Sequence, residues 1–133
     1  MFLVRYLASI HMLGWTPHLI VVDDLSMCTL TDKIKAVALL QNAVQLFDTK
    51  LRDSEGTGCK YLVSESVVED KVAEQVGVWD RLLPVIFTTS PLNTGTVELM
   101  CVRAFKRRDP YALRVLYSFS PEGVTINLMS ARA

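Results

Sequence analysis

One short segment constrains the fold most: four consecutive apolar residues are followed by two aspartates, in the order Leu19, Ile20, Val21, Val22, Asp23 and Asp24. A short β-branched run without polar alternation is typical of a strand that is covered on both faces. Pro17 bounds this run at its N-terminal side. We therefore predict a central parallel strand over residues 18–22, which requires a layered fold in which helices pack on a sheet.

Two stretches with helical spacing flank this strand. Apolar residues recur every three or four positions from Phe2 to Leu13 and again over Leu30–Leu51. Thr29 directly precedes the second stretch, and Asp32 stands three positions after Thr29. This spacing is typical of a helix N-terminal cap. A second strand is predicted over Tyr61–Ser64. Because a long helix connects the two strands, we expect them to be parallel.

The second half of the chain has a different pattern of apolar and turn residues. Residues 66–81 predict a loop with weak helical character. Four apolar runs then alternate with turns that contain Pro, Asn and Gly, and they cover Val85–Thr89, Val97–Phe105, Ala112–Phe119 and Val124–Leu128. Tight turns of this kind connect antiparallel strands. The sequence thus predicts an α/β fold with parallel central strands and an antiparallel C-terminal meander, in a single domain over residues 1–133.

Charge and composition narrow the function classes. Fourteen Lys and Arg balance fourteen Asp and Glu in 133 residues, half of the residues are hydrophobic, and the mean hydropathy is +0.28. Neutrality argues against a protein whose main task is to bind phosphate backbones, since that task needs an excess of Lys and Arg.

No apolar stretch approaches the roughly 18 residues of a spanning helix. We therefore expect no membrane contact. The three cysteines lack metal-ligand spacing, so we expect reduced thiols.

The two aspartates carry the clearest chemical signal. A buried strand that ends in Asp is the form of a Walker B motif, in which the carboxylate of Asp23 would hold the Mg²⁺ of a nucleotide. The same pair also fits a simpler role, in which Asp23 and Asp24 begin a polar loop or cap a helix. The phosphate-binding G-x-x-x-x-G-K-[ST] loop does not occur in the sequence. We therefore expect no enzyme activity, ATP hydrolysis or metal site from this chain alone.

The order of these features resembles the C-terminal part of a RecA-like recombinase core, as in the eukaryotic recombinase paralogues that assist the strand-exchange recombinase. Leu19–Asp23 correspond to the Walker B strand of that family, and Leu30–Leu51 correspond to the long helix after it. Tyr61–Ser64 correspond to the strand that ends in a polar trio near the γ-phosphate, which reads Ser64-Glu65-Ser66 here. The later strands are similar to the terminal meander. The resemblance implies a truncated RecA-like core, a single partial RecA-like domain.

The resemblance also implies a function. It points to a non-catalytic subunit that binds a fuller recombinase paralogue possessing a P-loop and promotes the recombinase filament in homologous recombination repair. ATP and Mg²⁺ would sit at an interface shared with that partner, close to Asp23 and Asp24. The chain would reach single-stranded DNA mainly through its partners, and it would act in the nucleus.

Two departures bear on DNA binding. The segment that corresponds to the DNA-binding loop of the family, Glu65–Arg81, contains five acidic and two basic residues, so it would repel a phosphate backbone. A basic cluster stands elsewhere, at Lys106, Arg107 and Arg108. It is interpreted as a solvated turn before Asp109, with a single DNA contact as the alternative role.

A different class of function also uses the aspartate pair. Asp23 and Asp24 could hold Mg²⁺ in a small phosphoryl-transfer or receiver-like protein. A receiver needs a further Asp at the end of a middle strand and a downstream Lys, whereas the second strand ends in Ser64 and Glu65. Phosphatases of the Asp-x-Asp type need a spacer between the acids. We therefore keep this interpretation as the alternative.

Overall fold

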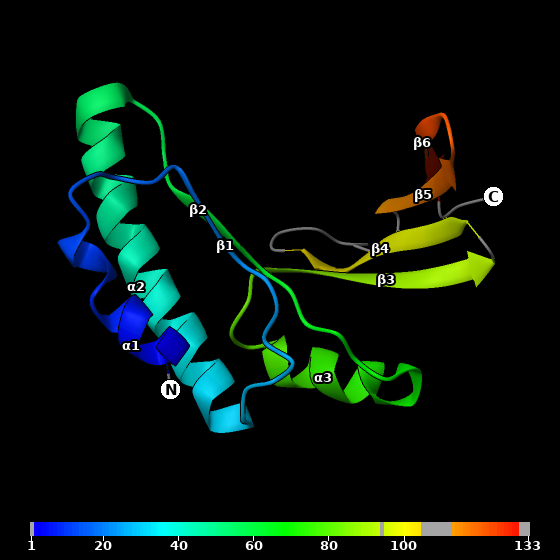
Figure 1. The fold of residues 1–133 in the computed structure, drawn as a ribbon, viewed down its shortest axis with the longest axis horizontal. Coiled ribbons are helices and arrows are strands. Elements are labelled where there is room, and N and C mark those ends of the chain that lie inside the picture. The colour runs from blue at the N-terminus through cyan, green and yellow to red at the C-terminus, as the bar shows by residue number, and fades with distance from the viewer. Residues whose placement is uncertain (1, 94, 105–112, 131–133) are drawn as a thin grey trace. The chain divides into compact units, whose positions relative to one another are not determined.

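The computed structural model describes residues 2–93, 95–104 and 113–130, which form a mixed α/β fold (Figure 1). The chain divides into two compact units, Met1–Val67 and Val68–Ala133. The first unit contains a two-stranded parallel sheet, and the second contains a four-stranded antiparallel sheet. No helix in the described part of the chain is long and apolar enough to span a membrane.

The first unit confirms the predicted helix and strand order. Its elements are α1 (Phe2–Ala8), the short 3₁₀ helix η1 (Ile10–Met12), β1 (Leu19–Val22), α2 (Leu30–Glu55) and β2 (Lys60–Val63). The strands β1 and β2 are parallel, as predicted, in a register that pairs Leu19 with Lys60 and Val22 with Val63. The first helix is shorter than predicted, because α1 ends at Ala8 and only η1 continues toward Leu13.

Local signals define both ends of α2. The backbone N–H of Asp32 donates a hydrogen bond to Thr29 Oγ1 at 3.2 Å, so Thr29 is the predicted N-cap and satisfies one of the free amides of the first turn. At the other end Gly56 adopts a left-handed conformation with φ of 72° and donates its N–H to the carbonyl of Arg52. Glycine reaches this conformation without the steric cost that a side chain brings.

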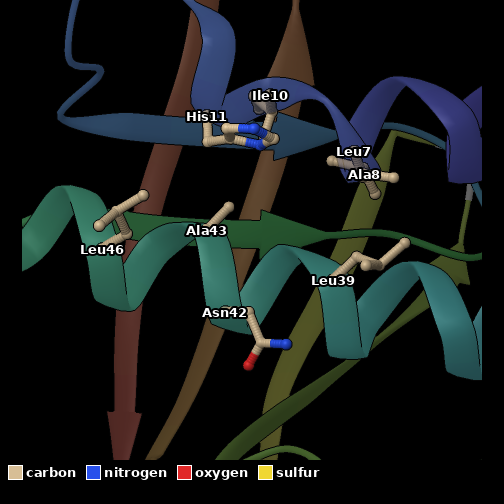
Figure 2. A pocket seen from close by; sticks show the side chains of 8 residues that line it. All are labelled: Leu7, Ala8, Ile10, His11, Leu39, Asn42, Ala43 and Leu46. Atoms are coloured by element: carbon tan, nitrogen blue, oxygen red, sulfur yellow. The ribbon is translucent and has the colours of Figure 1, made fainter.

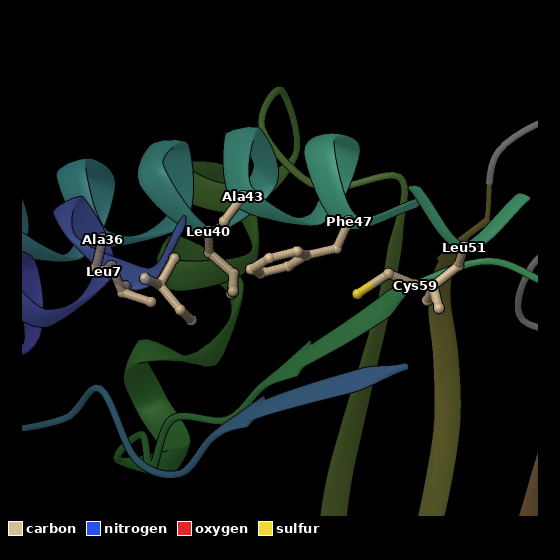
Figure 3. Packing of buried hydrophobic residues seen from close by; sticks show 8 residues of the cluster. Leu7, Ala36, Leu40, Ala43, Phe47, Leu51 and Cys59 are labelled. Atoms are coloured by element: carbon tan, nitrogen blue, oxygen red, sulfur yellow. The ribbon is translucent and has the colours of Figure 1, made fainter. Parts of the chain in front are cut away.

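The hydrophobic core of the first unit lies between α2, α1 and the parallel sheet. Its buried residues are Leu7 of α1, Ile10 of η1, Ala36, Leu40, Ala43, Phe47 and Leu51 of α2, and Cys59, which precedes β2 (Figure 3). Phe47 and Leu40 are almost completely buried, with 1% and 0% of their surfaces exposed. The inward residues of the strands, such as Ile20 and Tyr61, pack against this cluster. The two helices therefore cover one face of the sheet.

The other face of the same sheet is exposed, although the sequence predicts that it is covered. Leu19, Val21 and Leu62 are 59%, 53% and 58% exposed, although each belongs to an apolar strand. Within the described residues the sheet has only two strands, so β1 is not a central strand, and no other element of the first unit packs on this face. The prediction that β1 is covered on both faces is therefore wrong for the first unit by itself.

The second unit contains the predicted antiparallel meander. After η2 (Glu69–Lys71) and α3 (Val72–Trp79), the strands run in the order β3 (Val85–Asn93), β4 (Thr96–Ala104), β5 (Leu113–Ser120) and β6 (Gly123–Ser130). All neighbours in the sheet are antiparallel. The segment that was predicted to be a loop with weak helical character thus contains a two-turn helix.

The first hairpin of the meander differs from its prediction in the position of the turn. Residues 90–95 were expected to form the turn, but Ser90 pairs with Glu98 and Pro91 pairs with Val97, so β3 extends to Asn93. The reversal occurs next to Gly95, whose φ is 84°. The basic cluster Lys106, Arg107 and Arg108 lies outside the described residues.

Candidate functional site

The carboxyl ends of β1 and β2 meet at one edge of the parallel sheet. The register pairs Val22 with Val63, so the residues that follow each strand come together although they are about forty positions apart. The backbone continues this pairing, because Ser64 N–H donates to the carbonyl of Val22 at 3.1 Å and Leu25 N–H donates to the carbonyl of Ser64 at 2.9 Å. Asp23 and Asp24 therefore lie beside Ser64 and Ser66, as expected for parallel strands.

Asp23 is bound to the second strand through a side chain. The hydroxyl of Ser64 donates a hydrogen bond to Asp23 Oδ1 at 2.5 Å, and both residues are exposed at the end of the sheet. The peptide bond between Asp23 and Asp24 is cis. Asp23, which directly follows β1, is thus in contact with Ser64, which directly follows β2.

Asp24 has contacts with two further serines. Its Oδ1 accepts bonds from the Ser26 backbone N–H at 2.8 Å and the Ser26 hydroxyl at 2.5 Å. Its Oδ2 accepts a bond from the Ser66 hydroxyl at 3.0 Å. The backbone N–H of Ser66 in turn donates to Ser26 Oγ at 2.7 Å. Both oxygens of Asp24 are therefore used to hold the loop after β1 against the loop after β2. We call Asp23, Asp24, Ser26, Ser64 and Ser66 the aspartate–serine cluster.

These contacts change the acidity of Asp24. Hydrogen bonds stabilise the ionised carboxylate, so they lower its pKa. The Ser26 hydroxyl makes the largest contribution, and it outweighs the opposing effect of partial desolvation at Asp24. The carboxylate is therefore an acceptor of hydrogen bonds from its own chain at neutral pH.

An ion pair lies next to the cluster. Lys33, in the second turn of α2, bonds through Nζ to Oε1 of Glu65, between Ser64 and Ser66. These side chains are only 12% and 11% exposed. Glu65 was predicted to contribute to a repulsive acidic loop, but in the structure a lysine faces it. The pair ties α2 to the end of β2 and keeps the polar trio in position.

The cluster offers few ligands to a metal. Within the residues that the structure describes, no group of three or more His, Cys, Asp or Glu side chains is arranged to hold a metal ion. A magnesium ion takes about six oxygen ligands and keeps several waters. Asp24 already accepts bonds at both oxygens, which leaves Asp23 as the residue best placed to face an ion. The described residues do not fit Mg²⁺ without donors from another molecule.

Sequence reasoning identified part of this site. It placed Asp23 and Asp24 at the end of a strand and Ser64 and Ser66 at the end of the next. It missed Ser26 and Lys33. The spacing Asp-x-Ser over residues 24–26 is the signal that could have found Ser26, because an Asp side chain commonly bonds the N–H two positions later. No comparable local signal exists for Lys33, which pairs with a residue 32 positions away.

A separate apolar pocket lies between α1, η1 and α2 (Figure 2). Its volume is about 220 Å³, and most of its lining is aliphatic, from residues such as Leu7, Leu39 and Leu46. His11 and Asn42 are the polar residues in the lining. The pocket shares no residue with the aspartate–serine cluster, and no described acidic or cysteine side chain lines it. Its volume is smaller than the roughly 300–1,000 Å³ of typical ligand-binding pockets.

No protein-family model, no curated protein and no solved structure matches this chain.

Proposed function

We propose that the chain is a non-catalytic subunit of a recombinase-paralogue complex, with one partial RecA-like domain over residues 1–133. In this proposal it binds a fuller paralogue that has its own P-loop, and the pair promotes the function of the strand-exchange recombinase filament on single-stranded DNA. Its place of action is the nucleus, during homologous recombination repair.

The observation that carries this proposal is the exposed apolar face of the β1–β2 sheet. Parallel sheets in stable domains are covered on both faces, and a pair of strands alone is marginally stable in water. Here α1 and α2 cover one face, whereas Leu19, Val21 and Leu62 are more than half exposed on the other. A protein partner that covers this face would remove apolar surface from water and complete the layered architecture.

The aspartate–serine cluster supports a positioning role for the acids. A carboxylate that acts in phosphoryl transfer holds a metal ion or a reacting oxygen. Both oxygens of Asp24 instead accept hydrogen bonds from Ser26 and Ser66, and Asp23 accepts one from Ser64. The cluster is thus suited to fix the edge of the sheet that a partner would meet. ATP and Mg²⁺, where present, would be held mainly by the partner, with Asp23 as the contribution of this chain.

Direct DNA binding has little support among the described residues. The chain is neutral overall, and the segment Glu65–Arg81 is acidic. In the proposed complex the partner and the filament therefore supply most of the contacts to single-stranded DNA.

Co-purification tests the proposal. The full chain is co-expressed with each P-loop-containing recombinase paralogue of the same organism, and the soluble complex is isolated through a tag on the paralogue. We expect one paralogue to retain the chain in a stable stoichiometric complex, and we expect cells without the chain to be defective in recombination repair. Absence of any complex, or normal repair in its absence, would overturn the proposal.

The alternative function is tested on the same material. The chain alone is assayed for ATP hydrolysis and for phosphatase activity with Mg²⁺, next to the Asp23→Asn variant. We expect no turnover from either protein. Turnover that Asp23→Asn abolishes would favour a Mg²⁺-dependent phosphoryl-transfer protein that uses Asp23 and Asp24.

A further inference from the structure

The last strand of the antiparallel sheet, β6, has an edge with no protection against pairing. In the described residues β6 is hydrogen-bonded to β5 only, and it forms one edge of the sheet (Figure 1). Its eight residues, Gly123–Ser130, include no charged residue and no proline. An edge strand presents a row of free N–H and C=O groups, and natural proteins usually guard it with charges, prolines or bulges. The β6 edge has none of these devices.

The opposite edge of the same sheet is guarded. The strand β3 contains Pro91, which cannot donate a backbone hydrogen bond. Its pairing with β4 is also irregular at two places, between Ile86 and Phe87 and between Pro91 and Asn93. Such irregularities twist an edge away from regular pairing. The contrast between the two edges of one sheet indicates that β6 is the edge that another strand can join.

The side-chain pattern of β6 indicates which strand can pair with it. Val124 and Ile126 are 55% and 63% exposed, and they alternate with the polar residues Thr125 and Asn127. In an antiparallel pair, directly opposite residues lie on the same face of the sheet. Two copies of β6 centred on Ile126 therefore place Ile126 opposite itself and Thr125 opposite Asn127 of the second copy. Apolar residues meet apolar ones, and polar residues meet polar ones.

The apolar face continues into the neighbouring strand. Val124 is opposite Phe119 and Ile126 is opposite Tyr117 in the register with β5, and Phe119 is 55% exposed. Pairing two sheets through β6 would thus join two apolar patches across a two-fold axis. The zero net charge of the chain removes the long-range repulsion that keeps many proteins apart.

We propose that β6 is a dimerisation strand, which pairs antiparallel with β6 of a second copy of this chain and joins two four-stranded sheets into one of eight strands. The contact is isologous, because the same strand contributes on both sides. Pairing through the four-stranded sheet closes at two copies, since that sheet has one open edge in each copy and its β3 edge is guarded. This inference does not depend on the proposed function, because it concerns the second unit and a different partner.

The introduction of charges at Ile126, which lies on the two-fold axis of the proposed dimer, tests the pairing. Two copies of the full chain with different affinity tags are expressed together, as wild type, Ile126→Lys or Ile126→Glu. Ile126 is exposed, so these changes leave the fold intact, which circular dichroism verifies. We expect the wild-type copies to purify together, the Lys–Lys and Glu–Glu combinations to lose at least tenfold in recovery, and the Lys–Glu combination to recover it. Leu92→Lys, at an apolar residue of β3 that is 53% exposed, is the control and should purify like the wild type.

A cross-link gives a second readout. Directly opposite residues of antiparallel strands have Cα atoms about 4.5–5.5 Å apart, a distance that a disulfide can span. In a Cys28→Ser background, Ile126→Cys should give a disulfide-linked dimer under mild oxidation, whereas Leu92→Cys should not. Wild-type copies that never purify together would overturn the proposal. So would association that persists equally in the Lys–Lys combination, or assemblies that lengthen without limit as the concentration rises.

Discussion

The hydroxyl of Ser64 donates a 2.5 Å hydrogen bond to the carboxylate of Asp23, across the ends of two parallel strands and 41 positions apart in the chain. This contact depends on the parallel pairing of β1 and β2. The long helix α2 returns the chain to the end of the sheet where β1 begins, so β2 runs in the same direction and ends beside Asp23. The residues that define the candidate site are therefore positioned by the helix as much as by the strands. Changes in α2 or its connections should reach the site through this geometry.

The first prediction concerns pH. Hydrogen bonds from Ser26 and Ser66 lower the pKa of Asp24 in the folded chain relative to the unfolded chain. They stabilise the fold above the unfolded pKa of about 4, and this contribution is lost as the pH falls through the lower folded pKa. Urea unfolding at a series of pH values should show a smaller loss of stability on acidification in Asp24→Asn than in the wild type. Asp53→Asn, at an exposed position of α2, should follow the wild-type profile, and identical profiles for all three proteins would contradict the assignment.

The second prediction concerns the connection from α2 to β2. Asp48 accepts hydrogen bonds from Arg52 Nε at 2.8 Å and from the Cys59 backbone N–H at 3.0 Å. A Cβ atom on Gly58 would lie 2.3 Å from Asp48 Oδ1, so the Asp48 side chain would have to move and release these partners. We expect Gly58→Ala to lower the midpoint of thermal unfolding by about 5 °C.

Gly14→Ala is the matched control for that change. No heavy atom lies within 4 Å of a Cβ at Gly14, so the midpoint of its unfolding transition should stay close to the wild-type value. The account of the Asp48 contacts would be wrong if Gly58→Ala unfolded at the same temperature as Gly14→Ala.

The third prediction concerns the core of the first unit. Phe47 is 1% exposed and points from α2 into the core of the first unit, whereas its neighbour Leu46 on the same helix is 42% exposed. Removal of a buried phenylalanine ring loses its transfer free energy and leaves a cavity. We expect Phe47→Ala to lower the free energy of unfolding by about 3–5 kcal/mol, and Leu46→Ala to change it by less than about 1 kcal/mol. Chemical denaturation of both variants measures the difference, and equal losses would contradict the described packing.

Part of the fold could be predicted because its signals are local. Thr29 and Asp32 define the start of α2, and a helical connection of this length makes the joined strands parallel. The helical spacing ended at Leu51, whereas α2 continues to Glu55. The exposure of Leu19 and Val21 does not follow from any local pattern in the sequence. An apolar sequence shows that a strand can be buried, but it does not tell whether the covering layer belongs to the same chain.

The candidate site was also predicted in part, for a similar reason. The position of Asp23 and Asp24 at a strand end follows from the sequence alone. Their contacts with Ser64 and Ser66 depend on the register of β1 and β2, which no local pattern specifies. The first turn of the meander was misplaced because Pro91 and Asn93 are strong turn residues, yet pairing with β4 holds this segment in an extended conformation.

The most direct test of the central claim is a binding titration between the proposed partner, a paralogue with a P-loop, and variants of this chain. Val21→Lys places a charge on the exposed face of the β1–β2 sheet, and Met12→Lys places the same charge on η1, where Met12 is 76% exposed. If the paralogue covers the sheet face, Val21→Lys should weaken binding at least tenfold and Met12→Lys should bind like the wild type. Equal affinity of the two variants, or no binding of the wild-type chain to any paralogue, would contradict the account.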